Sequence, residues 1–291
     1  MVVIKLIQRS YDDKPILYLV PTPIGNFDDI TIRSLEILKS VEVVFCEDTR
    51  ITSNLLKHFN INKKLISCHE HNEKSKVLVA LSYLEKGYNI AYCSDQGSPL
   101  ISDPGFILSK EIVKHGYNLV SLPGTTSFVP ALSNSLLDPM PFLFYGFLNS
   151  NNNKQLKELE LLKNVKYTMI FFESGKRIIN TLKNIYMEFG DRNISISREI
   201  SKIYEEVIRD SISNLIKNEN SLILKGEFVL VVSGNDQFKN YSDNDIILLV
   251  DDYINSGYKQ MDAIKKIAKD IELKKSYVYS LYVNNKNEGK K

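Results

Sequence analysis

The stretch Asn89–Gly105, NIAYCSDQGSPLISDPG, decides the fold, because an apolar run ends there in a long polar loop. The run Asn89–Ser94 has the length and composition of a buried strand. In the loop that follows, glycines permit backbone conformations that other residues adopt only at a cost, and prolines stiffen the chain. Asp, Gly, Ser and Pro are also ordinary turn formers. So dense a loop at the end of a strand nevertheless favours a binding site for a small polar molecule.

The same pattern of apolar run, polar loop and amphipathic stretch repeats through residues 16–137. The amphipathic stretches have apolar residues at helical spacing, as at Val77, Leu81 and Leu84. Strands that alternate with helices predict βαβ units and a largely parallel sheet, which is an α/β fold. The other strands expected in this part are Ile16–Val20, Val41–Cys46, Lys64–Cys68 and Asn118–Leu122.

Beyond Asp138–Pro141, where two prolines suggest a hinge, fewer helical segments separate the strands. This change predicts a second α/β domain with a mixed sheet. The strands expected in it are Phe142–Phe147, Tyr167–Phe172, Asn193–Arg198 and Phe228–Ser233, and the helices are Arg177–Phe189 and Ser211–Asn218.

The end of the chain is predicted to be helical, over Asp245–Asn255, Gln260–Ile271 and Lys275–Val283. This module is rich in Lys and Tyr, which suits either a solvated helical face or a piece that contacts RNA. The domains expected from the sequence are residues 15–139, 140–236 and 237–291.

Composition limits the class of protein. Of the 291 residues 43% are apolar, enough for a sizeable core, and the net charge is +2. Cys46, Cys68 and Cys93 are widely spaced near the ends of expected strands, so we expect buried free thiols there. No signal-peptide pattern and no apolar run of roughly 20 residues occurs, which predicts a cytoplasmic protein without a membrane segment.

Ligands of an open parallel sheet bind beyond the carboxyl ends of its strands, where polar residues gather in this chain. Asp95 directly follows a strand, and its carboxylate could meet a cationic amino group or ribose hydroxyls. The hydroxyls of Thr125–Ser127 could either cap a helix or, together with free N–H groups, hold ligand atoms. His69 and His71 lack a third ligand at a recognisable spacing, so no metal site is predicted. The other polar loops are Pro21–Asn26 and Glu47–Arg50.

Three common kinds of site are disfavoured because their motifs are missing. No G-x-G-x-x-G follows the first strand, which disfavours a dinucleotide site, and no G-x-x-x-x-G-K-[ST] loop occurs. No G-x-S-x-G nucleophile elbow is present either.

At these loops the sequence resembles the ribosomal RNA small-subunit methyltransferase I family of the tetrapyrrole-methylase superfamily. The likeness runs from about residue 16 to 234 and continues more weakly through the helical tail. The chain departs from the family at Gln96, where Ala is common, at Thr125-Thr126, often Pro-Ser or Pro-Cys, and at Lys176, where His is usual. The matching segments are Leu19–Asn26 (LVPTPIGN), Glu47–Arg50 (EDTR), His71-Asn72, Ser94–Gly105 (SDQGSPLISDPG), Phe144–Leu148 (FYGFL), Phe171–Arg177 (FFESGKR), Ser197–Glu206 (SREISKIYEE) and Lys225–Gly234 (KGEFVLVVSG).

The resemblance implies a methyltransferase that uses S-adenosylmethionine, bound in a cleft between two α/β domains. It implies transfer of the methyl group to the ribose 2′-hydroxyl of a cytidine in the decoding region of 16S rRNA, by a homodimer. The acceptor would be free 16S rRNA or the small ribosomal subunit. Two alternatives stay open: a methylase of tetrapyrroles or other small substrates with the same fold, and a non-catalytic ribosome-assembly factor.

The loops and the resemblance together give the expected site residues. The side chains and backbone expected to hold the cofactor are those of Pro23, Asp95, Gly97, Leu100, Ile101, Thr126, Ser127, Phe172 and Gly226. The candidates for a catalytic base are Glu47 and Glu173, between which the sequence does not decide. The residues expected to bind RNA are Arg50, His71, Lys176, Arg177, Arg198 and Lys225.

Overall fold

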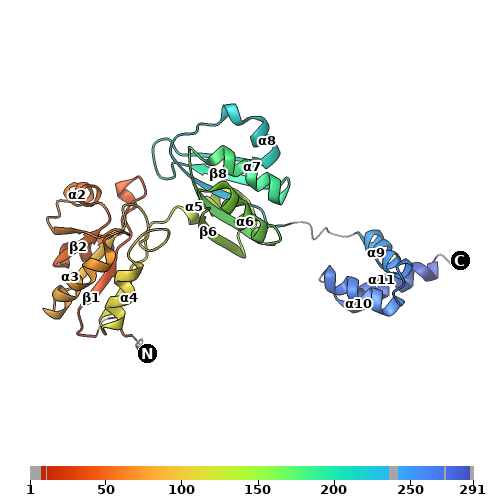
Figure 1. Ribbon diagram of the computed structural model, residues 1–291, viewed down its shortest axis with the longest axis horizontal. Helices are drawn as coiled ribbons and strands as arrows, with labels where there is room; N and C mark the ends of the chain where they lie inside the picture. Colours follow the sequence, from red (N-terminus) through yellow and green to blue (C-terminus); the bar gives the residue numbers. More distant parts are fainter. Residues whose placement is uncertain (1–7, 11, 236–241, 272, 289–291) are drawn as a thin grey trace. The chain divides into compact units, whose positions relative to one another are not determined.

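Two five-stranded sheets with the helices that cover them, and a further group of three helices, form the described part of the chain (Figure 1). The computed structural model describes residues 8–10, 12–235, 242–271 and 273–288. It divides into two compact units, Met1–Gly234 and Asn235–Lys291, and the first unit contains both sheets. The predicted domain boundaries stay predictions, and the one between residues 236 and 237 lies outside the described residues.

The first sheet is entirely parallel and has the strand order β3-β2-β4-β1-β5. The crossovers from β1 and from β4 run in opposite directions, so the order switches where these two strands lie side by side. The predicted parallel sheet is confirmed. Its strands are β1 (Ile16–Leu19), β2 (Val43–Cys46), β3 (Lys64–Ser67), β4 (Ile90–Cys93) and β5 (Asn118–Ser121).

Helices cover both faces of this sheet. Leu38 and Leu56, from the helices after β1 and β2, pack on one face, while Leu81 and Leu108, from the helices after β3 and β4, pack on the other. Burying such a side chain stabilises the fold by about 1.5–3 kcal/mol. The helical elements are η1 (Phe27–Asp29), α1 (Ile32–Ser40), α2 (Thr49–His58), α3 (Glu73–Glu85) and α4 (Phe106–Lys114). Cys46, Cys68 and Cys93 are buried free thiols, as predicted.

The second sheet is mixed, as predicted, with the order β6-β7-β10-β8-β9, in which only the β6–β7 pair is parallel. Its strands are β6 (Phe142–Phe147), β7 (Thr168–Ser174), β8 (Asn193–Arg198), β9 (Glu206–Ser211) and β10 (Glu227–Val232). Its helical elements are α5 (Phe128–Ser135), α6 (Asn152–Leu162), α7 (Ile178–Phe189), α8 (Ile212–Lys217) and η2 (Glu219–Ser221).

The two faces of the second sheet have different partners. Leu159, Leu182 and Leu215, from α6, α7 and α8, pack on one face. On the other face Ala131 and Leu132 of α5 pack against residues of β7 and β10. A side chain of β7 or β10 therefore points to one environment or the other according to its position in the strand.

The second unit consists of α9 (Asp243–Asn255), α10 (Gln260–Asp270) and α11 (Lys275–Glu288), so the predicted helical tail is confirmed. Ser242 and Asp245 form a capping box at the start of α9. The three helices share a core that includes fully buried Val278 and Tyr282.

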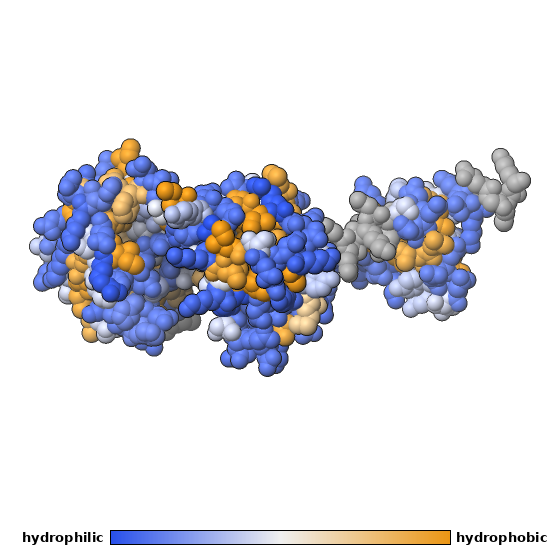
Figure 2. Space-filling view, turned by 90° about the horizontal axis from the view of Figure 1, so that it is seen from above, coloured by the Kyte–Doolittle hydropathy of each residue, from blue (hydrophilic) through white to orange (hydrophobic). Residues whose placement is uncertain are grey.

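The described surface is mostly hydrophilic, with scattered apolar patches on both units (Figure 2). Ile203 is among its most exposed large apolar side chains, at 91%. None of the described helices combines the length and the apolar composition that crossing a bilayer requires.

Candidate functional site

Three loops at the carboxyl edge of the first sheet are joined by hydrogen bonds. Thr22, after β1, and Gly97, after β4, exchange backbone hydrogen bonds of 2.9 and 3.0 Å. Thr125, after β5, donates its hydroxyl to the Thr22 carbonyl at 2.6 Å, and Ser98 donates to the Thr125 carbonyl at 2.9 Å. Gly97 has φ 77°, where a side chain would be strained. The loops therefore form one preorganised rim at the point where the strand order switches.

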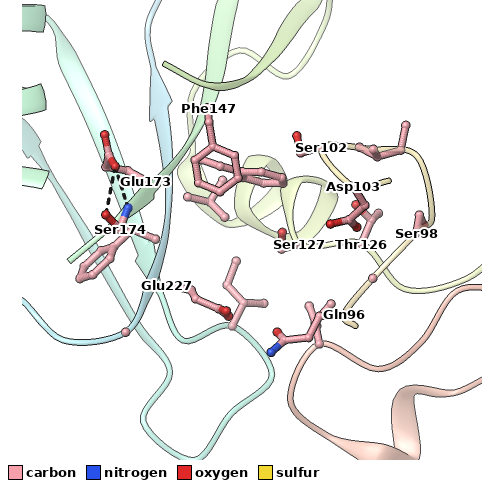
Figure 3. Close-up of a pocket in the computed structure, with 18 residues that line it drawn as sticks. Gln96, Ser98, Ser102, Asp103, Thr126, Ser127, Phe147, Glu173, Ser174 and Glu227 are labelled. Atoms are coloured by element: carbon pink, nitrogen blue, oxygen red, sulfur yellow. Dashed lines mark hydrogen bonds between the residues drawn. The ribbon is translucent and has the colours of Figure 1, made fainter. Parts of the chain in front are cut away.

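A cavity of about 380 Å³ lies between this rim and the second sheet, inside the first unit. Figure 3 shows Asp103, Thr126 and Ser127 on the side of the first sheet's loops, facing Phe147 and Glu227 from the second sheet. The cavity is lined by Ile24, Gln96, Gly97, Ser98, Ile101, Ser102, Asp103, Thr126, Ser127, Phe147, Phe172, Glu173, Ser174, Ile200, Gly226, Glu227, Phe228 and Val229.

Six of the residues expected to hold a cofactor come together at this cavity: Gly97, Ile101, Thr126, Ser127, Phe172 and Gly226. Ser127 precedes α5, but no side-chain hydrogen bond caps that helix. Capping by a side chain is therefore not the use of these hydroxyls in α5, and ligand binding by Thr126 and Ser127 stays a prediction.

Three other expected cofactor residues, Pro23, Asp95 and Leu100, do not line the cavity. Pro23 is buried, and Leu100 packs against the core with φ 71°. Asp95 accepts a hydrogen bond from the backbone N–H of Asp48 at 2.9 Å. Its carboxylate therefore braces the loop after β2 against the loop after β4.

Carboxylates cluster behind the rim. Burial raises the pKa of Asp103 to about 7, with a further contribution from the negative charge of Glu47. Burial and Asp95 raise the pKa of Glu47 in turn, and burial also raises the pKa of Asp95. Of the three, only Asp103 lines the cavity. Asp103 was not among the residues expected at the site, because the sequence alone does not show which loop carboxylate is buried in the folded protein.

Glu173, the other candidate base, lines the cavity but its side chain is fully buried in a network of its own. It accepts hydrogen bonds from the Thr181 hydroxyl at 2.6 Å and the Ser174 backbone at 2.8 Å, and it pairs with Arg177 at 3.3 Å. Since Thr181 lies on α7, the carboxylate faces the helices that cover the opposite side of the sheet. These contacts fix the turn after β7.

The basic residues expected to bind RNA divide into two groups. Lys176 and Lys225 are exposed, and each lies within two positions of a residue that lines the cavity, Ser174 or Gly226. The Arg177 guanidinium, in contrast, donates to the Leu148 carbonyl at 2.8 Å and the Asn149 carbonyl at 3.1 Å.

Two further residues expected to bind RNA are engaged in ion pairs, and a third, His71, lies beside a carboxylate. Arg198 pairs with Glu206 at 3.0 Å, and Arg50 pairs with Asp48 at 2.5 Å. His71 lies 3.2 Å from Glu70. Asp48 is also the N-cap of α2, so the Glu47–Arg50 loop has a structural use of its own.

Gly226 allows two loops of the second sheet to approach each other. It has φ 110°, and a Cβ there would lie 2.6 Å from the Glu199 carboxylate. Lys202 bridges Glu199 and Glu227 at 3.0 and 2.7 Å, which holds the loop after β8 beside the cavity. In the described part of the chain no His, Cys, Asp or Glu side chains form a group of three that could hold a metal ion.

The profile of the tetrapyrrole (corrin/porphyrin) methylases matches residues 16–216. Ribosomal RNA small subunit methyltransferase I of Bacillus subtilis (strain 168) is 42% identical over 284 residues, which are 94% of this chain and 97% of that protein. The chain belongs to this family of methylases. The resemblance seen in the sequence motifs is thereby confirmed.

Solved structures of tetrapyrrole methylases share the fold at low sequence identity. A cobalt precorrin-4 methyltransferase has a TM-score of 0.57 at 17% identity, covering 79% of this chain and 98% of its own. A uroporphyrin-III C-methyltransferase from Thermus thermophilus, complexed with S-adenosylhomocysteine, has a TM-score of 0.54 at 15% identity. The match covers 74% of this chain and 96% of that protein.

Proposed function

We propose that this methylase transfers a methyl group from S-adenosylmethionine to a ribose 2′-hydroxyl of a cytidine in 16S rRNA. The observation that carries the proposal is a lined cavity at the switch point of the first sheet, in a chain that shares 42% of its residues with an rRNA small subunit methyltransferase I. A homodimer in the cytoplasm, acting on free rRNA or the small subunit, belongs to the same proposal.

The cavity fits a cofactor with an adenine ring and a charged amino-acid end. Its volume of about 380 Å³ lies within the range of small-molecule sites. Ile24, Ile101 and Phe172 supply apolar surface for a planar ring, whereas Thr126 and Ser127 offer hydroxyls at the start of α5. The hydroxyl and backbone groups therefore suit the polar amino-acid end of the cofactor. The apolar side chains suit its adenine ring.

When bound, the cofactor supplies an electrophilic methyl group on a positively charged sulfur. The residues of the chain have to hold the acceptor in line with that methyl group, since alignment accounts for much of the barrier in such displacements. The hydrogen-bonded rim of Thr22, Gly97 and Thr125 provides rigidity on one side of the cavity. The Lys202 bridge between Glu199 and Glu227 provides it on the other.

Lys176 and Lys225 are the best placed of the expected RNA ligands. Both side chains are exposed, whereas the side chains of Arg177 and Arg198 are occupied by carbonyls or carboxylates. An exposed lysine beside the cavity can neutralise a phosphate and release a counterion, which contributes affinity without reading sequence.

Methyl incorporation tests the proposal. Tritiated S-adenosylmethionine is incubated with the enzyme and either intact small subunits, naked 16S rRNA or a tetrapyrrole, and the label is located by nuclease digestion. We expect 2′-O-methylcytidine in the RNA.

RNA binding by the exposed lysines is tested separately. We expect Lys176→Ala to weaken RNA binding and to lower the salt dependence of the RNA affinity by about one in log–log slope, because one phosphate contact is lost.

The matched control is Lys86→Ala, which removes an exposed lysine at the amino-terminal edge of β4, opposite the rim. It should leave RNA affinity unchanged. Label in the tetrapyrrole instead of the RNA would favour a small-substrate methylase, and cofactor binding without transfer to any acceptor would favour an assembly factor.

A further inference from the structure

Three carboxylates line the cavity among the described residues, and they are not equivalent. Glu173 is held by Thr181, Ser174 and Arg177, and the Glu227 carboxylate is paired with Lys202 at 2.7 Å. Asp103, by contrast, has no cationic partner among the described side chains. The cavity thus contains one carboxylate that is not neutralised by a neighbouring cation.

We infer that Asp103 is the catalytic base, which removes the proton from the acceptor hydroxyl as the methyl group is transferred. This inference rests on the function proposed above. It names a residue that neither the expected bases nor the expected cofactor residues included.

The backbone fixes Asp103 in place. It lies between Ser102, with φ 65°, and the Pro104-Gly105 pair, where Gly105 has φ 112°. Left-handed conformations at residues other than glycine cost of order 1–3 kcal/mol and persist only where the surroundings enforce them. A Cβ on Gly105 would lie 2.8 Å from both Leu100 and Tyr92, so the end of the loop packs closely on the core. Figure 3 shows the Asp103 carboxylate within this loop, near Thr126 and Ser127.

The environment gives Asp103 the proton affinity of a base that works near neutral pH. Burial raises its pKa to about 7, the charges of Glu47 and Asp95 add to the rise, and the Ser94 hydroxyl opposes it. Tyr92 beneath the loop has its own pKa raised by burial, with smaller contributions from Glu47 and Asp103. A base is most effective when its pKa lies near the working pH.

The proton, the electrons and the leaving group balance in this step. The O–H bond of the acceptor breaks and its proton moves to the Asp103 carboxylate. The acceptor oxygen forms a bond to the methyl carbon, the carbon–sulfur bond of the sulfonium donor breaks, and its electron pair stays on sulfur. The products are a methyl ether, a neutral thioether and a protonated Asp103, which releases its proton to solvent.

The sign of the pH dependence follows from the raised pKa. Below about pH 7 Asp103 is mostly protonated and cannot accept a proton, so the rate of methyl transfer should rise with pH and level off above it. A bound sulfonium cation favours the carboxylate, so the midpoint for kcat should lie below the midpoint for the free enzyme.

The test compares Asp103→Asn, Asp103→Glu and the control Glu85→Gln with the wild type. For Asp103→Asn we expect kcat to fall about 10²- to 10⁴-fold and the pH dependence to vanish. Its cofactor Kd, measured by calorimetry, should stay within about threefold. Asp103→Glu should keep part of the activity with a shifted pH midpoint. Glu85→Gln, which removes the charge of an exposed carboxylate at the end of α3 that does not line the cavity, should behave like the wild type.

A second readout does not depend on activity. Cofactor binding near pH 7 should release protons in the wild type, because the cation lowers the pKa of Asp103, and calorimetry in two buffers of different ionisation enthalpy measures this release. The Asp103→Asn variant should release fewer protons when it binds the cofactor. A parallel loss of cofactor affinity and activity, or an unchanged pH profile, would overturn the role of Asp103. Wild-type enzyme that transfers no methyl group to RNA would instead contradict the proposed function.

Discussion

At the scale of single residues, the rim depends on a carboxylate that does not line the cavity. Asp95 was expected to meet a cationic amino group or ribose hydroxyls of the cofactor, and in the structure one of its carboxylate oxygens accepts a hydrogen bond from the backbone N–H of Asp48, at 2.9 Å. Burial raises the pKa of Asp95, so its negative charge is a cost in the folded protein. Asp95 therefore stabilises the loop through its hydrogen-bond acceptor oxygen and not through its charge.

This distinction predicts different results for two substitutions. Asp95→Asn retains an acceptor oxygen, so its cofactor Kd should stay within about threefold of the wild type. Asp95→Ala leaves the Asp48 N–H without its partner, which costs about 1–3 kcal/mol, and the two loops should separate enough to weaken cofactor binding about tenfold or more. Titration calorimetry measures both. Equal losses in the two variants would show that the charge itself contacts the cofactor.

Strand residues could be placed from the sequence more fully than loop residues. Phe171, Phe172 and Glu173 alternate across β7, so a sequence pattern that places Phe172 toward the cavity already places Glu173 toward α7. Asp103 carries no comparable periodic signal. Its pKa depends on burial and on Glu47, which is more than 50 positions away in the sequence, so only the folded chain reveals it.

At the scale of elements, nearly all strands could be predicted because buried parallel and central strands are apolar runs. The exception is β9, Glu206–Ser211, which was not expected from the sequence. It lies at the edge of the second sheet, and among the described strands its one partner is β8. Its sequence, EVIRDS, mixes polar and apolar residues, as an edge strand with one solvated side allows. The pairing that makes it a strand is supplied by β8.

The turn between β7 and α7 depends on a glycine for a different reason. A Cβ on Gly175 would lie 2.1 Å from the Leu224 carbonyl oxygen, which belongs to the backbone and cannot rotate away. Gly175→Ala should therefore separate the turn from the segment that leads into β10. Gly226 in that segment and Glu227 at the start of β10 line the cavity. We expect a loss of about 2–3 kcal/mol in stability and about tenfold or more in cofactor affinity.

The matched control for this change is Gly190→Ala at the end of α7. Gly190 has φ 74°, and a Cβ added there would meet no atom within 4 Å, so alanine adds backbone strain alone. Its ψ of −165° places Gly190 in a region that is essentially restricted to glycine, so the change should cost about 1–3 kcal/mol and leave cofactor affinity unchanged. Urea unfolding and calorimetry measure the two quantities. Wild-type cofactor affinity in Gly175→Ala would contradict the role of this turn.

At the scale of the whole molecule, the two compact units have separate cores. The sheets of the first unit bury apolar residues on both of their faces, while the second unit buries Ile246, Val250, Ile264 and Tyr282 among its own three helices. Ser242 caps the first of these helices from within the unit, and the Tyr282 hydroxyl bonds to Asp251. No described core cluster combines residues of both units.

Separate cores predict separate unfolding. A chain that ends at Gly234 should keep the cofactor Kd within about twofold of the full-length protein, because every described residue that lines the cavity precedes that position. Its main thermal transition should stay within about 2 °C of that of the full-length protein, since no apolar residue of its cores is removed.

A chain that begins at Asn235 should be helical by circular dichroism and should melt in a transition of its own. A shortened first unit that aggregates or loses the cofactor would show that the helical unit stabilises the fold. If the shortened chain keeps its cofactor affinity but binds small subunits more weakly, the helical unit contributes to RNA binding.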